Sequence, residues 1–496
     1  MSAVTHFGKW RIKPSGKLPI YLRFIINSSF TPEITKKHNI KTTLSNRTYL
    51  NHMMYWKAAE YNKFEKEIIN HLKNDDGWFE KYCKKEIEKA EEFYKKGLEL
   101  KKTNWTKKTN KEIKKQLLEI IEIERNFACP WYAQYPLDEY FESAIERELK
   151  KYMQETDNDF RKYVLIFTDP SKATEVSMER ENLVKLAREF FSKKENLNHL
   201  SENAKKKIKR HLDKYAYINS GWATGKAYIE KDITDRIKEI KKQIGSGASI
   251  KQMLYDTSEK KVEDGFREAL KKIKPDQIFK KLINKARFHS YVRNRRVEAF
   301  FNGDYGASFI YNEIARRSNF NEDLIIEVTV PEMIGALEGK KLPSKEEMDR
   351  RLNNYAMVVR NCETKLITDP EKIKKLERIY FVDVVGVMEI KGKMACLGGI
   401  IKGRAKVCLD KSEIGKIEKG DILVTQFTTP DFVPAMEKAA AIVADQGGLS
   451  SHAAIVSREL GVPCVIATKN GTRIIKDNDL LEVNAKTGVV KILERK

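Results

Sequence analysis

The sequence predicts a multidomain α plus α/β protein, with a mainly helical N-terminal region followed by a C-terminal β/β/α domain. Three observations support this prediction. At 496 residues, 41% of them hydrophobic and 33% charged, the chain is long enough for two or three globular domains. Apolar residues recur at three- and four-residue steps over residues 51–320, which is the period of an α-helix. In residues 391–496, short apolar runs typical of buried strands alternate with short helical segments.

Residues 1–50 are predicted to be an irregular segment with one short strand. Pro14 and Pro19 interrupt regular structure before the apolar run at residues 21–26, which is expected to form that strand. Residues 51–320 are predicted to form a mainly helical domain, with lysine and glutamate on the solvent-facing sides of its helices. Helix breaks are expected near residues 75–77, 129–130, 168–170 and 245–247.

Residues 321–390 are predicted to form a mixed connecting segment. The apolar run at residues 324–329 is expected to be a short strand. The Pro331 that follows favours a helix start, because proline suits the first helical positions. A second helix and an extended approach to the last domain are expected at residues 344–358 and 380–390.

The C-terminal domain, residues 391–496, is predicted to be built on short buried strands. Between the first two strands, Thr429, Pro430 and Asp431 are expected to start a helix, because they supply a hydroxyl cap, a proline and a first-turn carboxylate. The strands themselves are expected at residues 421–424, 440–444, 463–467, 480–483 and 489–493.

The most informative segment of the chain surrounds His452. Gly447 and Gly448 allow a close backbone approach, and Ser450 and Ser451 offer hydroxyl oxygens that can cap a helix. A later glycine and proline are expected to end that helix. His452 is therefore predicted to lie at or next to the first turn of a short helix.

A histidine in this position is suited to phosphoryl chemistry. The unpaired N–H groups and the dipole at a helix N-terminus favour an anion and disfavour imidazolium. A neutral imidazole is a nucleophile towards a phosphoryl group. The same location would stabilise the phosphohistidine dianion, so His452 is the candidate catalytic residue.

The last fifth of the chain resembles the mobile, swivelling phosphohistidine domain of phosphoenolpyruvate (PEP)-utilising enzymes. This family includes phosphoenolpyruvate synthase, pyruvate phosphate dikinase, rifampicin phosphotransferase and enzyme I of the sugar phosphotransferase system. The resemblance implies that His452 is phosphorylated and dephosphorylated during turnover and that Gly447, Gly448, Ser450 and Ser451 support the phosphoryl group. It also implies that residues 398–407 form the strand that opens the domain. The resemblance rests on residues 420–424, 428–436, 440–443 and 447–463.

The resemblance implies a phosphotransferase component that works with a partner. Full-length relatives also carry an ATP-grasp nucleotide domain or a PEP-binding barrel, and neither signature is found in residues 1–390. The glycines of residues 221–226 do not have the spacing of a phosphate-binding P-loop. Mg²⁺ and ATP, or phosphoenolpyruvate, are therefore expected to bind mainly on a separate ATP-grasp protein or subunit. The order and spacing of residues 131–133, 137–139, 293–317, 327–337 and 350–351 suggest a second resemblance. Through them, residues 51–360 resemble the helical segment between the nucleotide domain and the histidine domain of rifampicin-phosphotransferase-like and phosphoenolpyruvate-synthase-like proteins. This resemblance implies a role in binding the partner or a small-molecule acceptor.

Two other functions remain open at this stage. A non-catalytic regulatory or binding protein can retain a swivelling domain. The intact histidine, glycines and serines argue against such a loss of catalytic function. The net charge of +23, mostly carried before residue 391, is compatible with RNA or another polyanion as partner. Lysine-rich helix faces explain this charge equally well, and no aromatic-basic nucleic-acid motif is present, so a nucleic-acid partner is not expected.

The chain is expected to be cytoplasmic and not to enter a membrane. Its apolar runs are far shorter than the ~20 residues that a membrane span needs, and the N-terminus has no apolar signal-peptide region. The six cysteines are scattered without a C-x-x-C pair, so buried thiols are expected and a metal site is not.

Overall fold

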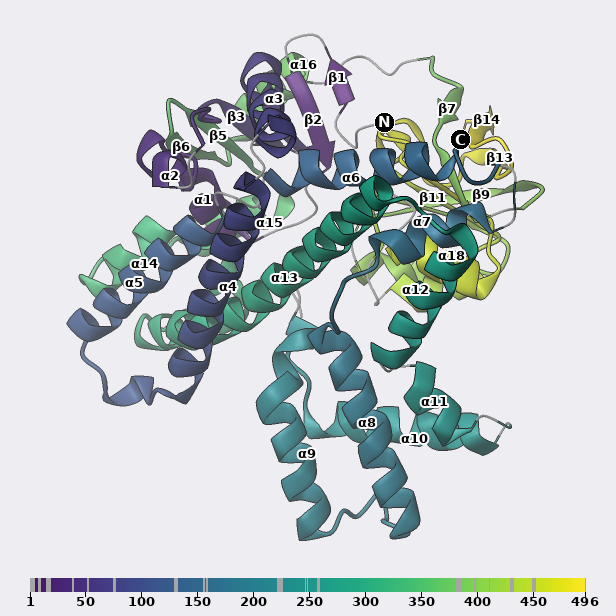
Figure 1. Cartoon of the computed structure of the whole chain (residues 1–496). Coiled ribbons are helices and arrows are strands. Elements are labelled where there is room, and N and C mark those ends of the chain that lie inside the picture. Colours follow the sequence, from purple (N-terminus) through teal and green to yellow (C-terminus); the bar gives the residue numbers. More distant parts are fainter. Residues whose placement is uncertain are drawn as a thin grey trace.

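In the computed structural model, 63% of the described residues are helical, and the described strands form two sheets (Figure 1). The helix-rich N-terminal region and the strand-rich C-terminal region agree with the predicted fold class. The boundaries at residues 50, 320 and 390 stay predictions. The structure describes residues 5–7, 10–14, 19–37, 40–50, 53–74, 77–128, 133–154, 157, 159–220, 226–245, 247, 249–256, 259–380, 386–396, 398–409, 411–428, 432–447 and 452–495.

Two long helices form the centre of the helical region. Helix α13 (Gln277–Arg317) has 41 residues and α4 (Trp78–Lys102) has 25, and the two lie against each other. Glycines permit the close approach. A Cβ atom added to Gly306 would lie 2.3 Å from the carbonyl oxygen of Gly97, and one on Gly97 would lie 2.4 Å from that of Asn302. The two backbones therefore touch where they cross.

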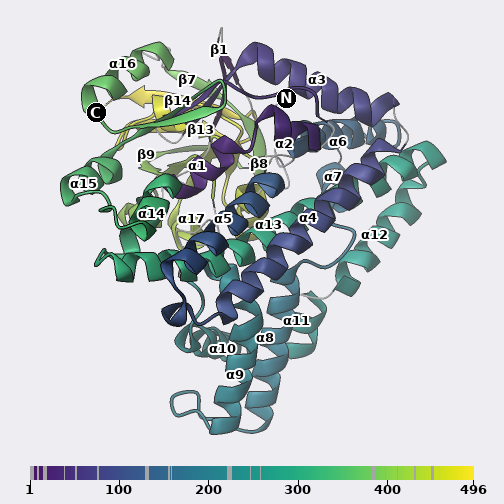
Figure 2. The same ribbon diagram turned by 90° about the vertical axis from the view of Figure 1, so that its left-hand side faces the viewer.

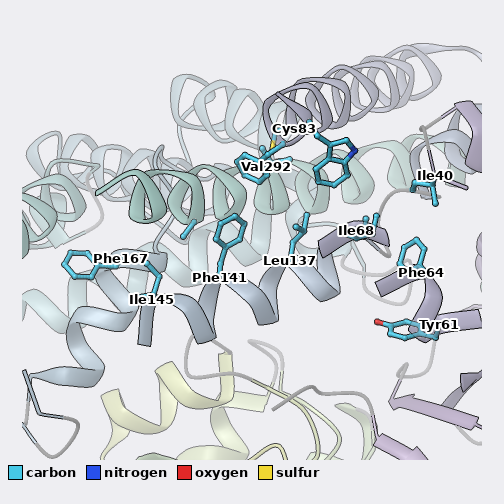
Figure 3. Close-up of a cluster of buried hydrophobic side chains, with 14 of the residues drawn as sticks. Ile40, Tyr61, Phe64, Ile68, Cys83, Leu137, Phe141, Ile145, Phe167 and Val292 are labelled. Carbon is cyan, nitrogen blue, oxygen red and sulfur yellow. The ribbon is translucent and has the colours of Figure 1, made fainter. Parts of the chain in front are cut away.

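Shorter helices pack around this pair and bury apolar side chains against it. Tyr61, Phe64 and Ile68, which share one face of α3, are buried as their helical spacing predicts. Figure 3 shows them in a cluster to which α4, α6, α7 and α13 also contribute side chains. The bounds of the surrounding helices are α3 (Ala58–Asn74), α5 (Asn110–Ala128), α6 (Gln134–Leu149), α7 (Phe160–Thr168) and α12 (Glu259–Ile273), with a 3₁₀ turn η1 (Trp105–Lys107) before α5.

A group of four helices projects from this body (Figures 1 and 2). It has a small core of its own, which includes Leu183, Phe190, Ile208 and Ile237. The helix breaks predicted near residues 168–170 and 245–247 are confirmed, because α7 ends at Thr168 and α10 ends at Gly245. Residues 75–76 and 129–130, at the other two predicted breaks, lie outside the described residues. The projecting elements are α8 (Glu175–Ser192), α9 (Glu202–Tyr215), η3 (Ala216–Ser220), α10 (Glu230–Gly245) and α11 (Ile250–Asp256).

The N-terminal sheet joins segments that are far apart in the sequence. Its strand order is β1-β2-β4-β3-β5-β6, and every neighbouring pair is antiparallel. Arg47 of β3 lies opposite Val359 of β5, so the predicted N-terminal and connecting segments share one sheet. The strands are β1 (Thr5–Phe7), β2 (Trp10–Pro14), β3 (Arg47–Leu50), β4 (Met53–Lys57), β5 (Ala356–Arg360) and β6 (Glu363–Ile367).

The strand predicted at residues 21–26 is wrong, because these residues belong to helix α1 (Ile20–Ser28). Tyr21, Leu22 and Ile25 are fully buried against α5 and neighbouring elements. An apolar run buried on several sides has no alternation, so its period does not distinguish a helix from a strand. A short helix α2 (Pro32–Lys37) follows.

The first part of the segment 321–390 contains one wrong and one confirmed prediction. The expected strand at residues 324–329 is a 3₁₀ helix, η4 (Glu322–Glu327). Helix α14 (Val330–Leu337) begins as predicted. Thr329 caps it in a reciprocal box with Glu332, in which the Thr329 amide donates to the Glu332 carboxylate at 2.8 Å.

The second predicted helix of this segment is shorter than expected. It is α15 (Lys345–Asn353), and residues 356–360 form β5 instead of its last turns. A further helix, α16 (Pro370–Tyr380), precedes the C-terminal sheet. Residues 381–385 of the predicted extended approach lie outside the described residues.

Two further expectations concern membranes and thiols. None of the helices in the described ranges combines the length and apolar character that crossing a bilayer requires. Cys362 is partly exposed, and Cys129 lies outside the described residues. The expected burial of thiols holds for Cys83, Cys396, Cys408 and Cys464.

Candidate functional site

The C-terminal region folds around a second sheet with strand order β7-β14-β13-β9-β10-β11-β12-β8. The four neighbouring strands β9, β10, β11 and β12 are parallel, and antiparallel strands flank them on both sides. The strands are β7 (Glu389–Lys391), β8 (Lys393–Cys396), β9 (Ile400–Cys408), β10 (Ile422–Thr425), β11 (Ala441–Ala444), β12 (Cys464–Ile466), β13 (Leu480–Asn484) and β14 (Val489–Glu494).

Each of the five strands predicted from apolar runs is present, with ends within a residue or two of those expected. The strand expected at residues 398–407 is also present as β9, but it does not open the sheet. β7 and β8 precede it, and β8 pairs with β12 at the opposite edge. The predicted helix start at Thr429, Pro430 and Asp431 lies outside the described residues, and helix α17 (Val433–Lys438) follows it.

Both faces of the parallel strands are buried. Leu423 and Ile442 pack against α17, α18 and the 3₁₀ turn η5 (Lys411–Lys416). Ile422 and Val443 face the other way, towards β13, β14 and a short helix, α19 (Gly471–Ile474). Burial on both faces explains why these strands are continuous apolar runs in the sequence.

His452 is the first residue of helix α18 (His452–Leu460), which connects β11 to the parallel strand β12. The helix therefore begins beyond the carboxyl end of β11. In α/β sheets, ligands bind in the region beyond the carboxyl ends of the strands. The backbone position predicted for His452 is thus found, while its side chain and the residues Gly448, Ser450 and Ser451 lie outside the described part of the chain.

The loop between β11 and α18 starts as a continuation of the sheet and then turns sharply. The amide of Asp445 donates to the carbonyl of Thr425 at 3.0 Å, and that of Gln446 donates to the carbonyl of Gln426 at 2.8 Å. Gly447 follows with a φ of +122°, a conformation that L side chains rarely adopt. This turn accounts for glycine at position 447.

Asp445 ties two loops together at this edge of the sheet. It is 2% exposed, and its carboxylate accepts hydrogen bonds from the Thr468 hydroxyl at 2.9 Å and from the backbone amide and hydroxyl of Thr472. Burial raises the pKa of Asp445, and the hydrogen bonds from Thr472 and Thr468 oppose that shift. The loop that leads to His452 is thereby anchored to the loop after β12.

Sequence reasoning passed over Asp445. The available signal was a lone carboxylate directly after a buried apolar strand and two residues before a pair of glycines. Such a residue can neither continue the strand core nor be left unsatisfied, so it must organise the adjoining loops. Its partners, Thr468 and Thr472, lie more than twenty residues further along the chain.

Helix α18 is fixed by small side chains. Ala453 and Ala454 are buried in its first turn, and the hydroxyl of Ser457 donates to the carbonyl of Ala454 at 3.1 Å. The helix packs against β8, β12 and α17. Gly461, with a φ of +67°, ends it as predicted, and the Val462 amide donates to the Ser457 carbonyl at 2.9 Å.

The arrangement is suited to an anion beside His452. The first amide groups of an α-helix have no carbonyl partner within the helix, and the dipole adds a partial positive charge there. Loops from β10, β11 and β12 meet at the same edge. The Asp445 amide donates to the Thr425 carbonyl, and the Asp445 carboxylate accepts a hydrogen bond from the Thr472 amide. The site therefore offers a helix N-terminus on a rigid sheet.

Residues 417–488 match the family model described as "PEP-utilising enzyme, mobile domain". The C-terminal region carries a PEP-utilising-enzyme mobile domain at these residues. The match includes β10, β11, β12 and the whole segment around His452.

Relatives of this mobile domain are named phosphoenolpyruvate synthase. The chain is 49% identical over 117 residues to "Probable phosphoenolpyruvate synthase" of Archaeoglobus fulgidus, which covers 24% of this chain and 15% of that protein. It is 56% identical over 92 residues to "Phosphoenolpyruvate synthase" of Pyrococcus furiosus, and this match covers 18% of this chain and 11% of that protein. A longer match, 34% identical over 184 residues, is to the Aquifex aeolicus protein of that name. It covers 36% of this chain and 22% of that protein. The chain thus spans less than a quarter of the length of each of these relatives.

Proposed function

We propose that this chain is a phosphotransferase component of the phosphoenolpyruvate synthase and dikinase type, in which His452 carries a phosphoryl group between two sites. The supporting observation is the position of His452. It opens α18 at the carboxyl edge of the parallel strands, inside the segment that matches the mobile domain. The relatives that share this segment are named phosphoenolpyruvate synthase.

The proposed chemistry has two steps. In the first, Nε2 of neutral His452 attacks a phosphorus atom, so that an N–P bond forms while the bond to the leaving group breaks. In the second, an acceptor oxygen attacks the same phosphorus atom, the N–P bond breaks and the histidine is regenerated. The N-terminus of α18 favours both the neutral imidazole and the anionic phosphoryl group. Gly447, Gly448, Ser450 and Ser451 would contact that group.

The donor site is proposed to lie mainly on a partner. Mg²⁺ and ATP, or phosphoenolpyruvate, would bind there, with the metal ion neutralising phosphate charge. An ATP-grasp protein or subunit is the proposed partner, because residues 1–390 carry no recognisable ATP-grasp signature. The acceptor is proposed to be a small molecule bound by the helical N-terminal region.

The experiment is a labelling assay on the full chain. The protein is incubated with Mg²⁺ and β- or γ-labelled ATP, or with labelled phosphoenolpyruvate, in the presence and absence of a candidate ATP-grasp partner. Phosphohistidine is scored as acid-labile, base-stable label. We expect His452→Ala to reduce this label to background. His199→Ala is the matched control, because His199 is exposed on the helical projection and should leave the label unchanged.

The outcomes separate the proposed function from its alternatives. Label that survives in His452→Ala would assign the carrier to another residue. No label under any condition, with folded protein and an active partner, would favour a non-catalytic binding or regulatory protein. Binding of RNA with a steep salt dependence in that case would favour the polyanion alternative.

A further inference from the structure

Two cysteines of the C-terminal sheet face each other across neighbouring strands. Cys396 of β8 and Cys464 of β12 are register partners in an antiparallel pair, and both are thiols. Residues directly opposite in such a pair have Cα atoms about 4.5–5.5 Å apart. Disulfides join residues whose Cα atoms are about 4.4–6.8 Å apart. The strand register therefore brings two thiols within reach of one S–S bond.

The two side chains also lie on the same face of the sheet. Cys464 pairs with Cys396 and Val465 pairs with Met394, so β8 carries one extra residue, Ala395, at this point. Ala395, Cys396 and Cys464 all belong to the apolar cluster under α17 and α18, whereas Val465 belongs to the cluster on the opposite face. The bulge thus places both sulfur atoms in one buried layer.

The segments next to the two strands also approach each other closely beside the cysteines. A Cβ atom added to Gly398 would lie 2.4 Å from Cγ of Pro463, the residue before Cys464. By contrast, Cys408 belongs to the same cluster but lies at the end of β9, and β10 and β11 separate it from β12. At about 4.8 Å per strand, it is too far from Cys464 to be bridged.

We propose that Cys396 and Cys464 are a redox-modification site that forms a reversible disulfide with a low-molecular-weight disulfide as oxidant. Cys396 is 8% exposed on the edge strand β8, and Cys464 is fully buried, so Cys396 reacts first when the edge opens locally. Its thiolate attacks oxidised glutathione, forms a mixed disulfide and releases one glutathione. The Cys464 thiolate then attacks Sγ of Cys396 and releases the second. The protein loses two electrons and two protons, and the glutathione disulfide gains them.

The disulfide restrains the helix that begins at His452. Ala453 and Ala454 of its first turn share the buried cluster with both cysteines, and α18 packs directly on β8 and β12. An S–S bond of about 2.05 Å fastens the edge strand under that turn. Oxidation should therefore slow amide exchange in residues 453–460 and raise the melting temperature. This inference depends on the cysteine geometry and not on the proposed phosphoryl transfer.

The test maps the disulfide in the full-length protein. The protein is treated with oxidised glutathione, alkylated without reduction, digested and analysed by mass spectrometry. We expect a linked peptide pair that contains Cys396 and Cys464, disappears after dithiothreitol and is absent from Cys396→Ser. Cys408→Ala is the matched control and should keep the linked pair. The oxidised protein should melt at least about 3 °C higher and exchange the α18 amides at least about twofold more slowly.

Contrary results are equally clear. Complete alkylation of both cysteines after the glutathione treatment would overturn the proposal. So would glutathione that stays on Cys396 without formation of the internal disulfide. Both results can be measured on the wild-type protein alone. A linked pair with unchanged exchange in residues 453–460 would overturn the coupling to α18.

Discussion

A cluster of two carboxyl groups and two tyrosines is buried where α1, α5 and α13 meet. The Tyr21 hydroxyl donates a hydrogen bond to Asp304, and Glu124 and Tyr311 lie beside them, each of the four at most 3% exposed. Burial raises the pKa of Asp304 to about 7. Burial, with Asp304 nearby, raises the pKa of Glu124 well above its ordinary value. Asp304→Asn keeps an oxygen acceptor for Tyr21 and removes the ionisation.

The size of the effect follows from the pKa shift. Asp304 ionises near 3.8 when unperturbed and near 7 in the folded protein. Between these values the folded state holds a proton that the unfolded state has lost, so the free energy of unfolding falls as pH rises. Each pKa unit corresponds to ~1.4 kcal/mol, so ionisation of Asp304 lowers the free energy of unfolding by on the order of 4 kcal/mol in total. The free energy of unfolding of Asp304→Asn, measured relative to that of the wild type, should therefore rise by roughly 2–3 kcal/mol from pH 5 to pH 8.

Urea denaturation followed by circular dichroism at pH 5, 6, 7 and 8 measures this difference. The pH-dependent part is the relevant readout, because any packing effect of the amide is the same at each pH. Asp159→Asn is the control. Lys272 lies 2.9 Å from Asp159 and lowers its pKa, so this variant should differ from wild type by a constant amount across the range. A difference for Asp304→Asn that is flat, or that shrinks with rising pH, would refute the reasoning.

Two further predictions concern the central helices. Gly306→Ala should destabilise the protein by roughly 1–3 kcal/mol, because the new methyl group would meet the backbone of Gly97. Gly265→Ala, which has nothing within 4 Å of the added atom, should instead stabilise by up to ~1 kcal/mol, and equal melting temperatures for the two variants would contradict this. Arg296→Met should cost roughly 3–5 kcal/mol, because Glu86, 3.0 Å away and 2% exposed, would lose its ion-pair partner. Adding Glu86→Leu should recover most of that loss in a urea double-mutant cycle, and an additive second loss would count against the argument.

The mobile domain was largely predictable from its sequence. Its central strands are buried on both faces, so each appears as an uninterrupted apolar run, and residues 422–425 and 441–444 were found almost to the residue. The helix start at His452 was predictable because glycines, serines and a later Gly461 mark both of its ends within a few positions. The cap at Thr329 was predictable for the same reason, because its partner Glu332 lies three residues away.

Errors occurred where the surroundings, and not the local pattern, select the element. Residues 20–28 and 322–327 are helical because other helices surround them, although their apolar runs were read as strands. The N-terminal sheet was missed because its pairing of Arg47 with Val359 joins residues more than three hundred positions apart. No local period records such a pairing.

The sequence by itself determined the helical period of the body, the strands and helix caps of the mobile domain, and the choice of His452 as the candidate carrier. These features depend on residues within one or two turns of each other, so the physical cause lies inside a short window. Only the tertiary structure decided that β8 lies beside β12, that Asp445 binds Thr468 and Thr472, and that α4 touches α13 through glycines. Those contacts arise because distant segments bury their apolar faces together, and their geometry exists only once the whole chain has packed.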